Sequence, residues 1–139
     1  MRLLPALCAA LLAVAACDTA EPETAPFLIV TLEGGAGAAV VAFETEDGVP
    51  CPNPRLLADV RESPTRLVVA ISGIGEDETC EGEGVRPATL DVPLAAVDLD
   101  GFEVRVSFAG RTDEYVIEAG SGAPVLRAVQ TSISRPGPR

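Results

Sequence analysis

The residues best placed to do chemistry are five carboxylates in the segment GIGEDETCEGEGVRP, residues 73–87. Within eight positions they surround Cys80, and they are Glu76, Asp77, Glu78, Glu81 and Glu83. Hard cations such as calcium bind several carboxylate and carbonyl oxygens offered by a turning backbone, so a cation site is one interpretation. The order of the residues does not match an EF-hand loop. We favour a solvated acidic loop held by a disulfide, because runs of charge usually stay hydrated.

The chain has few other side chains of the types that enzymes use for catalysis. The sequence has no His, and all ten of its basic residues are Arg, so the commonest general base and the Lys of Schiff-base chemistry are both missing. The six serines therefore have no His or Lys to activate them. A hydrolase built on paired carboxylates is an alternative, but no two of the 21 acidic residues stand out as a close pair. We predict that the protein is not an enzyme and that it holds no cofactor, calcium in the acidic loop being the one exception considered.

Two short segments look like fragments of ligand loops. Residues 98–101, Asp-Leu-Asp-Gly, resemble part of a calcium loop, but Asp and Gly are also the residues that turns prefer. Residues 34–37, Gly-Gly-Ala-Gly, lack the Lys and Ser/Thr of a phosphate loop. We predict that both are connectors between strands. The aromatic residues are expected to be mainly core residues and not a stacking surface; they are Phe27, Phe43, Phe102, Phe108 and Tyr115.

Residues 1–16 have the pattern of a secretory signal peptide. Arg2 is followed by an apolar stretch that is too short to cross a bilayer as a mature helix. The sequence Val14-Ala15-Ala16-Cys17 resembles the lipobox of bacterial lipoproteins, in which small residues precede a Cys that receives diacylglycerol and becomes the new N-terminus. This resemblance implies that Cys17 is lipidated and that the lipid bilayer is a partner of the chain. An ordinary secreted protein cleaved near residue 16 is the alternative.

After cleavage the chain carries nine Arg and 21 acidic residues, which gives a net side-chain charge of −12. Such a surface repels nucleic acid, so no nucleic-acid partner is expected. Residues 17–26 comprise the lipidated Cys and the acidic stretch DTAEPETAP, which predicts a flexible, solvated tether. The expected location is the bacterial cell envelope. The sequence leaves open whether the anchor lies in the inner or the outer membrane, and whether the globular domain is periplasmic or surface-exposed.

The four cysteines have different expected fates. Cys8 leaves with the signal peptide and Cys17 takes lipid, so Cys51 and Cys80 remain to form a disulfide in an oxidising compartment. This bond would close a loop of about 29 residues and contribute about 3 to 4 kcal/mol. A zinc site is a weaker alternative, because two thiols without His make a poor ligand set. A redox pair is weaker still, since catalytic dithiols usually lie close together in sequence.

From residue 27 onward, short runs rich in Val and Ile alternate with Gly and Pro clusters, which is the pattern of β-strands. We predict one domain over residues 27–134 and a disordered tail over 135–139. The only helical candidate is residues 55–62, where three apolar residues share a helical face, but the prolines on both sides confine it to about two turns at most. The predicted strands cover residues 27–33, 38–45, 66–72, 88–93, 102–108, 112–119 and 125–133.

The clearest predicted pair of strands is the hairpin over residues 102–119. A two-residue turn at Gly110-Arg111 is expected, because Gly accepts the positive φ that a type II′ turn needs first. This register places Val106 opposite Tyr115 and keeps the apolar faces together. It also sets Arg105 on the outer face, where it offsets the acidic residues of the second strand.

The sequences G-F-E-V-R-V-S-F and G-R-T-D-E-Y-V-I-E in this hairpin resemble immunoglobulin-like and fibronectin-type modules of bacterial envelope proteins, over about residues 88–133. The resemblance implies an all-β fold, an immunoglobulin-like β-sandwich of about seven strands, and it transfers no active site. The chain departs from immunoglobulin domains proper, because it has no Trp at all.

These observations predict a membrane-anchored envelope lipoprotein whose β-sandwich is a non-catalytic module for protein interaction or a structural role. An envelope protein is the expected partner. One alternative is the binding of a cation or small ligand through the acidic loop 73–87. A protease inhibitor or a small hydrolase on the same scaffold is the other alternative.

Overall fold

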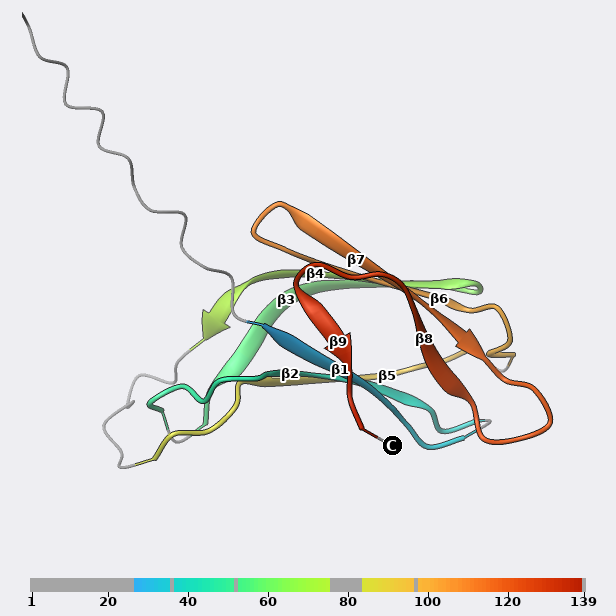
Figure 1. Ribbon diagram of the computed structural model, residues 1–139, viewed down its shortest axis with the longest axis horizontal. Coiled ribbons are helices and arrows are strands. Elements are labelled where there is room, and N and C mark those ends of the chain that lie inside the picture. The colour runs from blue at the N-terminus through green and yellow to red at the C-terminus, as the bar shows by residue number, and fades with distance from the viewer. Residues whose placement is uncertain (1–26, 36, 52, 76–83, 97, 139) are drawn as a thin grey trace, which may run out of the picture.

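The computed structural model describes residues 27–35, 37–51, 53–75, 84–96 and 98–138 (Figure 1). The signal peptide, the predicted lipidation site Cys17 and the tether lie outside the described residues. Cys80 and the five carboxylates of the predicted cation site also lie outside them. Within the described ranges, no helix has the length and apolar character needed to cross a membrane.

The described chain is built from β-strands that all join one sheet, which confirms the predicted all-β class. The order across the sheet is β8-β7-β6-β4-β3-β5-β2-β1-β9, and its two ends come close enough that the sheet is nearly closed into a barrel (Figure 1). The strands are β1 (Leu28–Glu33), β2 (Val40–Thr45), β3 (Arg55–Ser63), β4 (Arg66–Gly75), β5 (Thr89–Pro93), β6 (Glu103–Phe108), β7 (Arg111–Glu118), β8 (Val125–Gln130) and β9 (Ser134–Pro136).

The immunoglobulin-like sandwich of about seven strands is not confirmed. Immunoglobulin sandwiches consist of two antiparallel sheets, whereas here β4 pairs with β6, and β1 with β9, in parallel. The sheet nevertheless has two halves, because β3 and β5 are joined only by the residue pair Arg55 and Thr89. One half contains β3, β4, β6, β7 and β8, and the other contains β1, β2, β5 and β9.

The helical candidate over residues 55–62 is not a helix, because this segment is β3. It pairs antiparallel with β4 along its whole length. The alternation of a strand holds here, because Leu56 and Ala58 face the core while Leu57 is exposed, and Val60 is exposed as well. The β-bulge opposite Leu57 and Ala58 has its extra residue, Ser72, in β4. Leu56, Leu57 and Val60 have a spacing that also fits one face of a helix, which makes the segment a helical candidate in the sequence.

The predicted hairpin exists, but its register is wrong by two residues. Val104, not Val106, lies opposite Tyr115. The turn falls at Ala109 and Gly110, whose φ angles of 50° and 76° are both positive, as a type I′ turn requires. A shift of two residues keeps every side chain on its predicted face, which is why the apolar faces still match.

The predicted tail over residues 135–139 is not disordered along its length. Arg135 and Pro136 belong to β9, and Gly137 donates a backbone hydrogen bond to the carbonyl of Val30 at 2.8 Å. Pro lacks an N–H and is tolerated only at a sheet edge. The edge position of β9 meets this condition.

The core lies between the two halves of the sheet and is formed by alternate residues of most strands. Phe43, Phe102 and Tyr115 are fully buried and Phe108 packs against the core, as predicted, whereas Phe27 is exposed. The described residues of 34–37 lie between β1 and β2, and residues 98–101 lie before β6, so both segments are connectors, also as predicted. In the second of these, the amide of Asp100 donates to the carboxylate of Asp98 at 3.1 Å, which forms a tight turn.

Candidate functional site: an open seam in the sheet

The sheet is left open between β8 and the pair β1 and β9, and we call this opening the seam. β9 is three residues long, and among the described residues it pairs with Leu28–Val30 of β1 alone. In the described part of the chain, Thr31–Glu33 therefore has no strand on that side, and β8 pairs with β7 alone. Two strand edges with unpaired backbone groups thus face the same gap, which is the arrangement that a further strand can extend.

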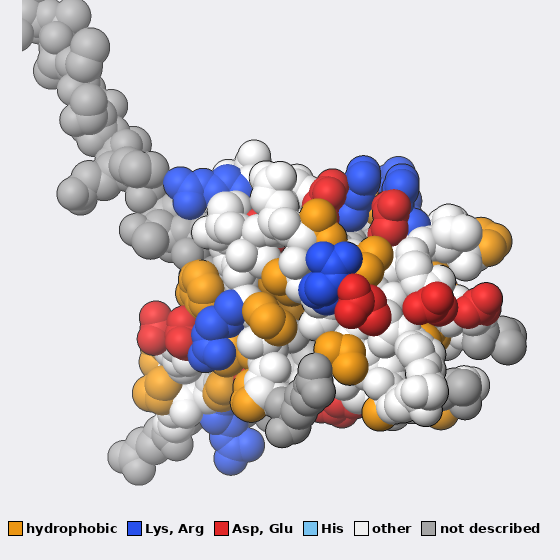
Figure 2. Space-filling model, turned by 45° about the vertical axis from the view of Figure 1, so that its right-hand side comes forward, with side chains coloured by type: hydrophobic (Ala, Val, Ile, Leu, Met, Phe, Trp, Pro, Cys, Tyr) orange, Lys and Arg blue, Asp and Glu red, His pale blue; other side chains and the backbone are white. Residues whose placement is uncertain are grey.

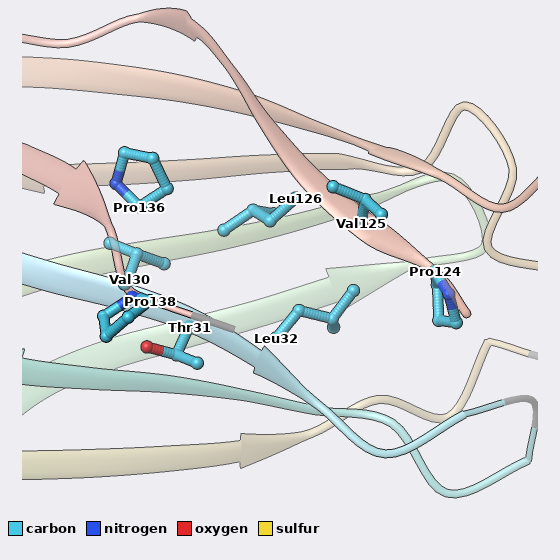
Figure 3. A pocket seen from close by; sticks show the side chains of 9 residues that line it. Val30, Thr31, Leu32, Pro124, Val125, Leu126, Pro136 and Pro138 are labelled. Carbon is cyan, nitrogen blue, oxygen red and sulfur yellow. The ribbon is translucent and has the colours of Figure 1, made fainter. Parts of the chain in front are cut away.

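The seam contains a groove of about 230 Å³ whose lining side chains are apolar apart from Thr31, and in which polar and apolar atoms are exposed about equally. Leu126 on β8, and Val30 and Leu32 on β1, project into the gap between the two strands (Figure 3). Val30 is fully buried, while Leu32 and Leu126 are partly buried and pack against the core. The rest of the lining comes from Thr31, Pro124, Val125, Pro136, Gly137 and Pro138. The groove therefore exposes one margin of the hydrophobic core to solvent.

The opposite end of the seam is held shut by the carboxylate of Asp113, which projects inward from β7 and is fully buried. Its two oxygens accept five hydrogen bonds from the turn between β8 and β9. The donors are the amides of Ser132, Ile133 and Ser134 at 2.6, 2.9 and 2.7 Å, and the hydroxyls of Ser132 and Ser134 at 2.8 and 2.6 Å. We call this arrangement the Asp113 clamp; it fixes where β9 leaves β8 and turns alongside β1.

The environment of the clamp shifts the pKa of two groups in opposite directions. Burial by itself raises the pKa of the Asp113 carboxyl, but the hydrogen bonds from Ser134, Ile133 and Ser132 outweigh it, and the pKa lies below its ordinary value. The hydroxyl groups of Tyr115 and Ser134 are 2.6 Å apart. Burial, assisted by the negative charge of Asp113, raises the pKa of Tyr115 to about 12. At neutral pH the clamp therefore holds an ionised carboxylate next to a neutral phenol.

The clamp groups two serines, an aspartate and a tyrosine, but the arrangement suits structure better than catalysis. Ser134 is buried, and its hydroxyl already contacts both Asp113 and Tyr115. A nucleophilic serine needs a base to take its proton and access to a substrate. An ionised carboxylate that accepts five hydrogen bonds is a weak base, so these residues hold the chain in place.

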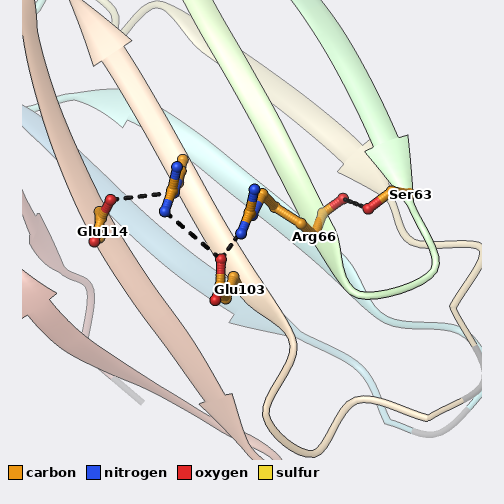
Figure 4. Close-up of polar contacts among 5 residues, drawn as sticks. Ser63, Arg66, Glu103 and Glu114 are labelled. Atoms are coloured by element: carbon orange, nitrogen blue, oxygen red, sulfur yellow. Dashed lines mark hydrogen bonds and ion pairs between the residues drawn. The ribbon is translucent and has the colours of Figure 1, made fainter.

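A ladder of ion pairs runs across the outer face of β4, β6 and β7. Glu103 accepts a hydrogen bond from Arg66 at 2.6 Å and lies 3.9 Å from Arg105, which in turn lies 3.1 Å from Glu114 (Figure 4). The hydrogen bond from Arg66, together with the charges of both arginines, lowers the pKa of Glu103. Arg105 does offset the acidic strand, as predicted, but through a directly opposite Glu114. Exposed pairs of this kind each contribute little to stability.

The charges around the seam are unevenly compensated. Arg127 pairs with Glu118 on one side of it, and Arg135 pairs with Glu46 on the other at 3.0 Å. Glu33, by contrast, ends β1 next to the groove and has no ion pair with any described residue. Hydrophobic patches lie between acidic and basic side chains on the face seen in Figure 2.

Two further acidic residues lie in the loop before β6, next to the end of β7 that pairs with the start of β8. The carboxylate of Asp100 accepts the amide of Ala119 at 3.0 Å, directly after the end of β7, and Asp98 is two residues away. Neither has an arginine partner in the described ranges. We call these three carboxylates, Glu33, Asp98 and Asp100, the acidic mouth of the seam.

A second hollow, of about 450 Å³, lies between the β3–β4 turn and residues 95–96 and is open to solvent. Glu62 is its charged lining residue, and this carboxylate accepts hydrogen bonds from the amides of Ala95 and Ala96 at 2.9 and 3.2 Å. The contact connects the two halves of the sheet where β3 and β5 diverge. We assign it a structural role.

Of the predicted site residues, the structure describes only Cys51. Its side chain is fully buried, and its amide donates to the carbonyl of Val49 at 2.7 Å. No cluster of three His, Cys, Asp or Glu side chains suited to a metal occurs in the described ranges. Asp113 was missed, although a signal was present: it shares the inward face of β7 with Tyr115 and Ile117, and a carboxylate on an apolar face requires hydrogen-bond partners.

No protein-family model, curated protein or solved structure matches this chain.

Proposed function

We propose that the chain is a membrane-anchored envelope lipoprotein whose β-domain is a non-catalytic module for protein interaction. The observation that supports this function is the seam, where two strand edges without a partner among the described residues lie beside a groove lined mainly by apolar side chains. Proteins usually cover or shorten exposed edges because these attract other strands. An edge that stays open beside such a groove is therefore suited to recognition.

The non-catalytic part of the proposal is supported by the use that the chain makes of its polar groups. The sequence lacks His and Lys. The buried carboxylate Asp113 holds the β8–β9 turn, and the carboxylate of Glu62 bridges the two halves of the sheet. These groups already have structural partners and would be poor general bases.

The membrane anchor remains a proposal that rests on the lipobox-like sequence before Cys17. Intact-mass spectrometry of the processed protein tests it. We expect a chain that begins at Cys17 and carries the added mass of diacylglycerol and an acyl chain. Cys17→Ser should abolish this mass, while Cys8→Ser, within the signal peptide, should leave it unchanged. An unmodified N-terminus at residue 17, or an N-terminus elsewhere, would contradict the anchor.

The Cys51–Cys80 disulfide is likewise proposed, and the described residues flanking Cys80 support it. Gly75 pairs with Arg55 in the β3–β4 ladder, and Arg86 exchanges backbone hydrogen bonds with Val49 at 2.7 and 3.1 Å. Val49 and Arg55 both lie within four residues of Cys51. Both ends of the segment that contains Cys80 are therefore held near Cys51, which lowers the entropy cost of closing the bond.

Crosslinking in intact cells tests the interaction function. The lipidated protein, crosslinked and purified from membranes, should retain one protein in a constant molar ratio over several preparations. The same treatment of a Cys17→Ser strain should lower this yield, because the module is no longer held at the membrane. Recovery of nothing except the lipid-processing machinery would contradict the proposed function.

A further inference from the structure

We infer that the seam binds an extended segment of a partner protein, with apolar side chains at alternate positions and a Lys or Arg at the end next to the acidic mouth. This inference rests on the proposed interaction function and names the site and the chemistry of the partner.

The two edges of the seam favour a polypeptide backbone as the ligand. Thr31–Glu33 of β1 and Val125–Gln130 of β8 each have a side without a partner strand in the described part of the chain. An inserted strand would satisfy backbone N–H and C=O groups on one or both sides, as in β-strand addition. The groove, at about 230 Å³, is smaller than the roughly 300–1,000 Å³ typical of the clefts and cavities that bind small molecules.

The floor of the groove defines the side chains that an inserted strand should carry. Leu32 and Leu126 face each other from the two edges and are only partly buried (Figure 3). On β8, Ala128 lies opposite the inward-facing Tyr115 but is exposed. Since successive residues of a strand point to opposite faces, apolar residues at alternate positions would cover these atoms and extend the core.

The charges favour a basic segment over a second copy of this chain. Among the described residues, the arginines beside the seam are paired with Glu118 and Glu46, whereas Glu33 and the nearby loop residues Asp98 and Asp100 have no arginine partner. A Lys or Arg entering next to these carboxylates would meet complementary charge. A second copy would bring the same acidic mouth and another net charge of −12, which opposes self-association.

The test uses the full lipidated protein in detergent micelles and a displayed library of random ten-residue peptides. We expect the selected peptides to alternate apolar and polar residues and to carry Lys or Arg at one end. Hydrogen exchange with a synthetic copy of a selected peptide should slow at residues 31–33 and 125–130 and stay unchanged on β3. Failure to enrich any peptide, or slowed exchange only at other strands, would overturn the inference.

Two pairs of variants test whether Glu33 and Leu126 contribute to binding of the peptide. Glu33→Lys should weaken binding of the selected peptide at least fivefold, whereas Asp91→Lys, the same charge change at an exposed position of β5, should change it less than twofold. Leu126→Glu should abolish binding, whereas Val129→Glu, on the outer side of the same strand, should not. Glu33→Lys keeps the test decisive if Leu126→Glu fails to fold. Equal effects within the charge pair would overturn the acidic-mouth assignment.

The crosslinked partner separates this inference from the proposed function. If Glu33→Lys and Leu126→Glu retain that partner as well as the wild type does, the interaction function stands and the seam is not its site. If no partner is recovered from the wild type, the function itself fails.

Discussion

Asp113 places a buried carboxylate next to the turn between β8 and β9. A buried carboxylate is costly unless hydrogen bonds compensate for its lost hydration. Here three consecutive backbone amides and two hydroxyls do so. The same carboxylate thereby satisfies backbone donors that would otherwise be buried without partners.

Asp113→Asn should lower the free energy of unfolding by about 3 kcal/mol at pH 7. The amide keeps the shape of the carboxylate, but it removes the charge and turns an NH₂ group toward backbone N–H donors. Urea denaturation measures the loss. Asp91→Asn, on the exposed face of β5, is the matched control and should change stability by less than about 0.5 kcal/mol; equal losses in the two variants would argue against the clamp.

Protonation of the Asp113 carboxylate should make the stability of the protein depend on pH. Since the pKa of Asp113 is lower in the folded protein than in the unfolded chain, the unfolded chain binds the proton more readily. The stabilisation is therefore fully present above the ordinary Asp value of about 4 and is lost as pH falls from there through the folded pKa. Urea denaturation between pH 2 and 7 should show this loss in the wild type, and the difference from Asp113→Asn should shrink toward acid pH.

The contribution of Tyr115 to stability is expected to be lost at alkaline pH, whereas that of Asp113 is lost at acid pH. The pKa of Tyr115 is raised from 10.0 to about 12, so the folded state favours the neutral phenol. Stability from this group is present below pH 10 and is lost as pH rises toward 12. Tyr115 is the only tyrosine, so the absorbance of its phenolate should titrate near pH 12 in the folded protein and near pH 10 in urea. Identical midpoints would contradict burial of the phenol.

Tyr115→Phe should remove the hydrogen bond to Ser134 and lower the free energy of unfolding by about 1 kcal/mol at pH 7, as thermal or urea denaturation would show. Because the ring stays in the core, a much larger loss would mean that the hydroxyl does more than contact Ser134.

At the scale of elements, alternation of apolar and polar residues predicted most strands and the inward faces of β6 and β7. It failed at β3, because Leu57 and Val60 are apolar but exposed, so the apolar residues of this strand do not alternate. It failed at β9, because a strand of three residues containing Pro136 has no local signal. The turn that leads into β9 is held by hydrogen bonds to Asp113, which lies 19 to 21 residues earlier in the chain. A contact over this sequence distance cannot be deduced from the local pattern of residues.

The predicted register of the β6–β7 hairpin was wrong for a different reason. The prediction gave the positive φ to Gly110 at the first turn position, whereas Ala109 also adopts a positive φ of 50°. The observed register places Arg105 directly opposite Glu114, 3.1 Å away. A type I′ turn also fits the twist of the two strands, and these gains outweigh the strain at Ala109.

Ala109→Asn should therefore stabilise the hairpin by about 0.5 to 1 kcal/mol, because Asn adopts positive φ more readily and Asn-Gly is the favoured type I′ sequence. Gly110→Ala should instead destabilise it by about 1 kcal/mol. Thermal melting of the two variants beside the wild type checks both signs. A loss of stability in Ala109→Asn would contradict the turn assignment.

At the scale of the whole molecule, the sequence predicted the all-β class but not the seam. The seam depends on which strands become neighbours, and the parallel pairs β4·β6 and β1·β9 join segments that are distant in the chain. The candidate site could not be predicted for the same reason. Leu32 and Leu126 have ordinary core patterns, and only the order of strands leaves them at an opening.

The proposed disulfide should contribute at this scale. Cys80→Ser is expected to lower the free energy of unfolding by about 3 kcal/mol, because the unfolded chain gains the freedom of an open loop. Reductant should destabilise the wild type and leave this variant unchanged in urea denaturation. Cys17→Ser is the control, since it should release a domain of unaltered stability from the membrane. Equal stability of wild type and Cys80→Ser would refute the pairing.

Calcium should have no effect if residues 76–83 form a solvated loop. At millimolar calcium we expect no heat of binding and no change in melting temperature. A saturable rise in melting temperature that disappears in a Glu78→Gln, Glu81→Gln double variant would instead establish the alternative cation site.

The pairing of β1 with β9 also orders events during synthesis. β1 is near the beginning of the domain and β9 near its end, so the first strand emerges more than 100 residues before its parallel neighbour. Until residues 132–134 are made, Asp113 has none of the five donors of its clamp, and the β7 that carries it cannot bury its carboxylate favourably. A chain that emerges from its N-terminus must therefore wait for its last strand before the domain is complete. If Cys17 is the anchor, the chain can be attached to the membrane before the domain has folded. β9 would then join the sheet next to the membrane surface.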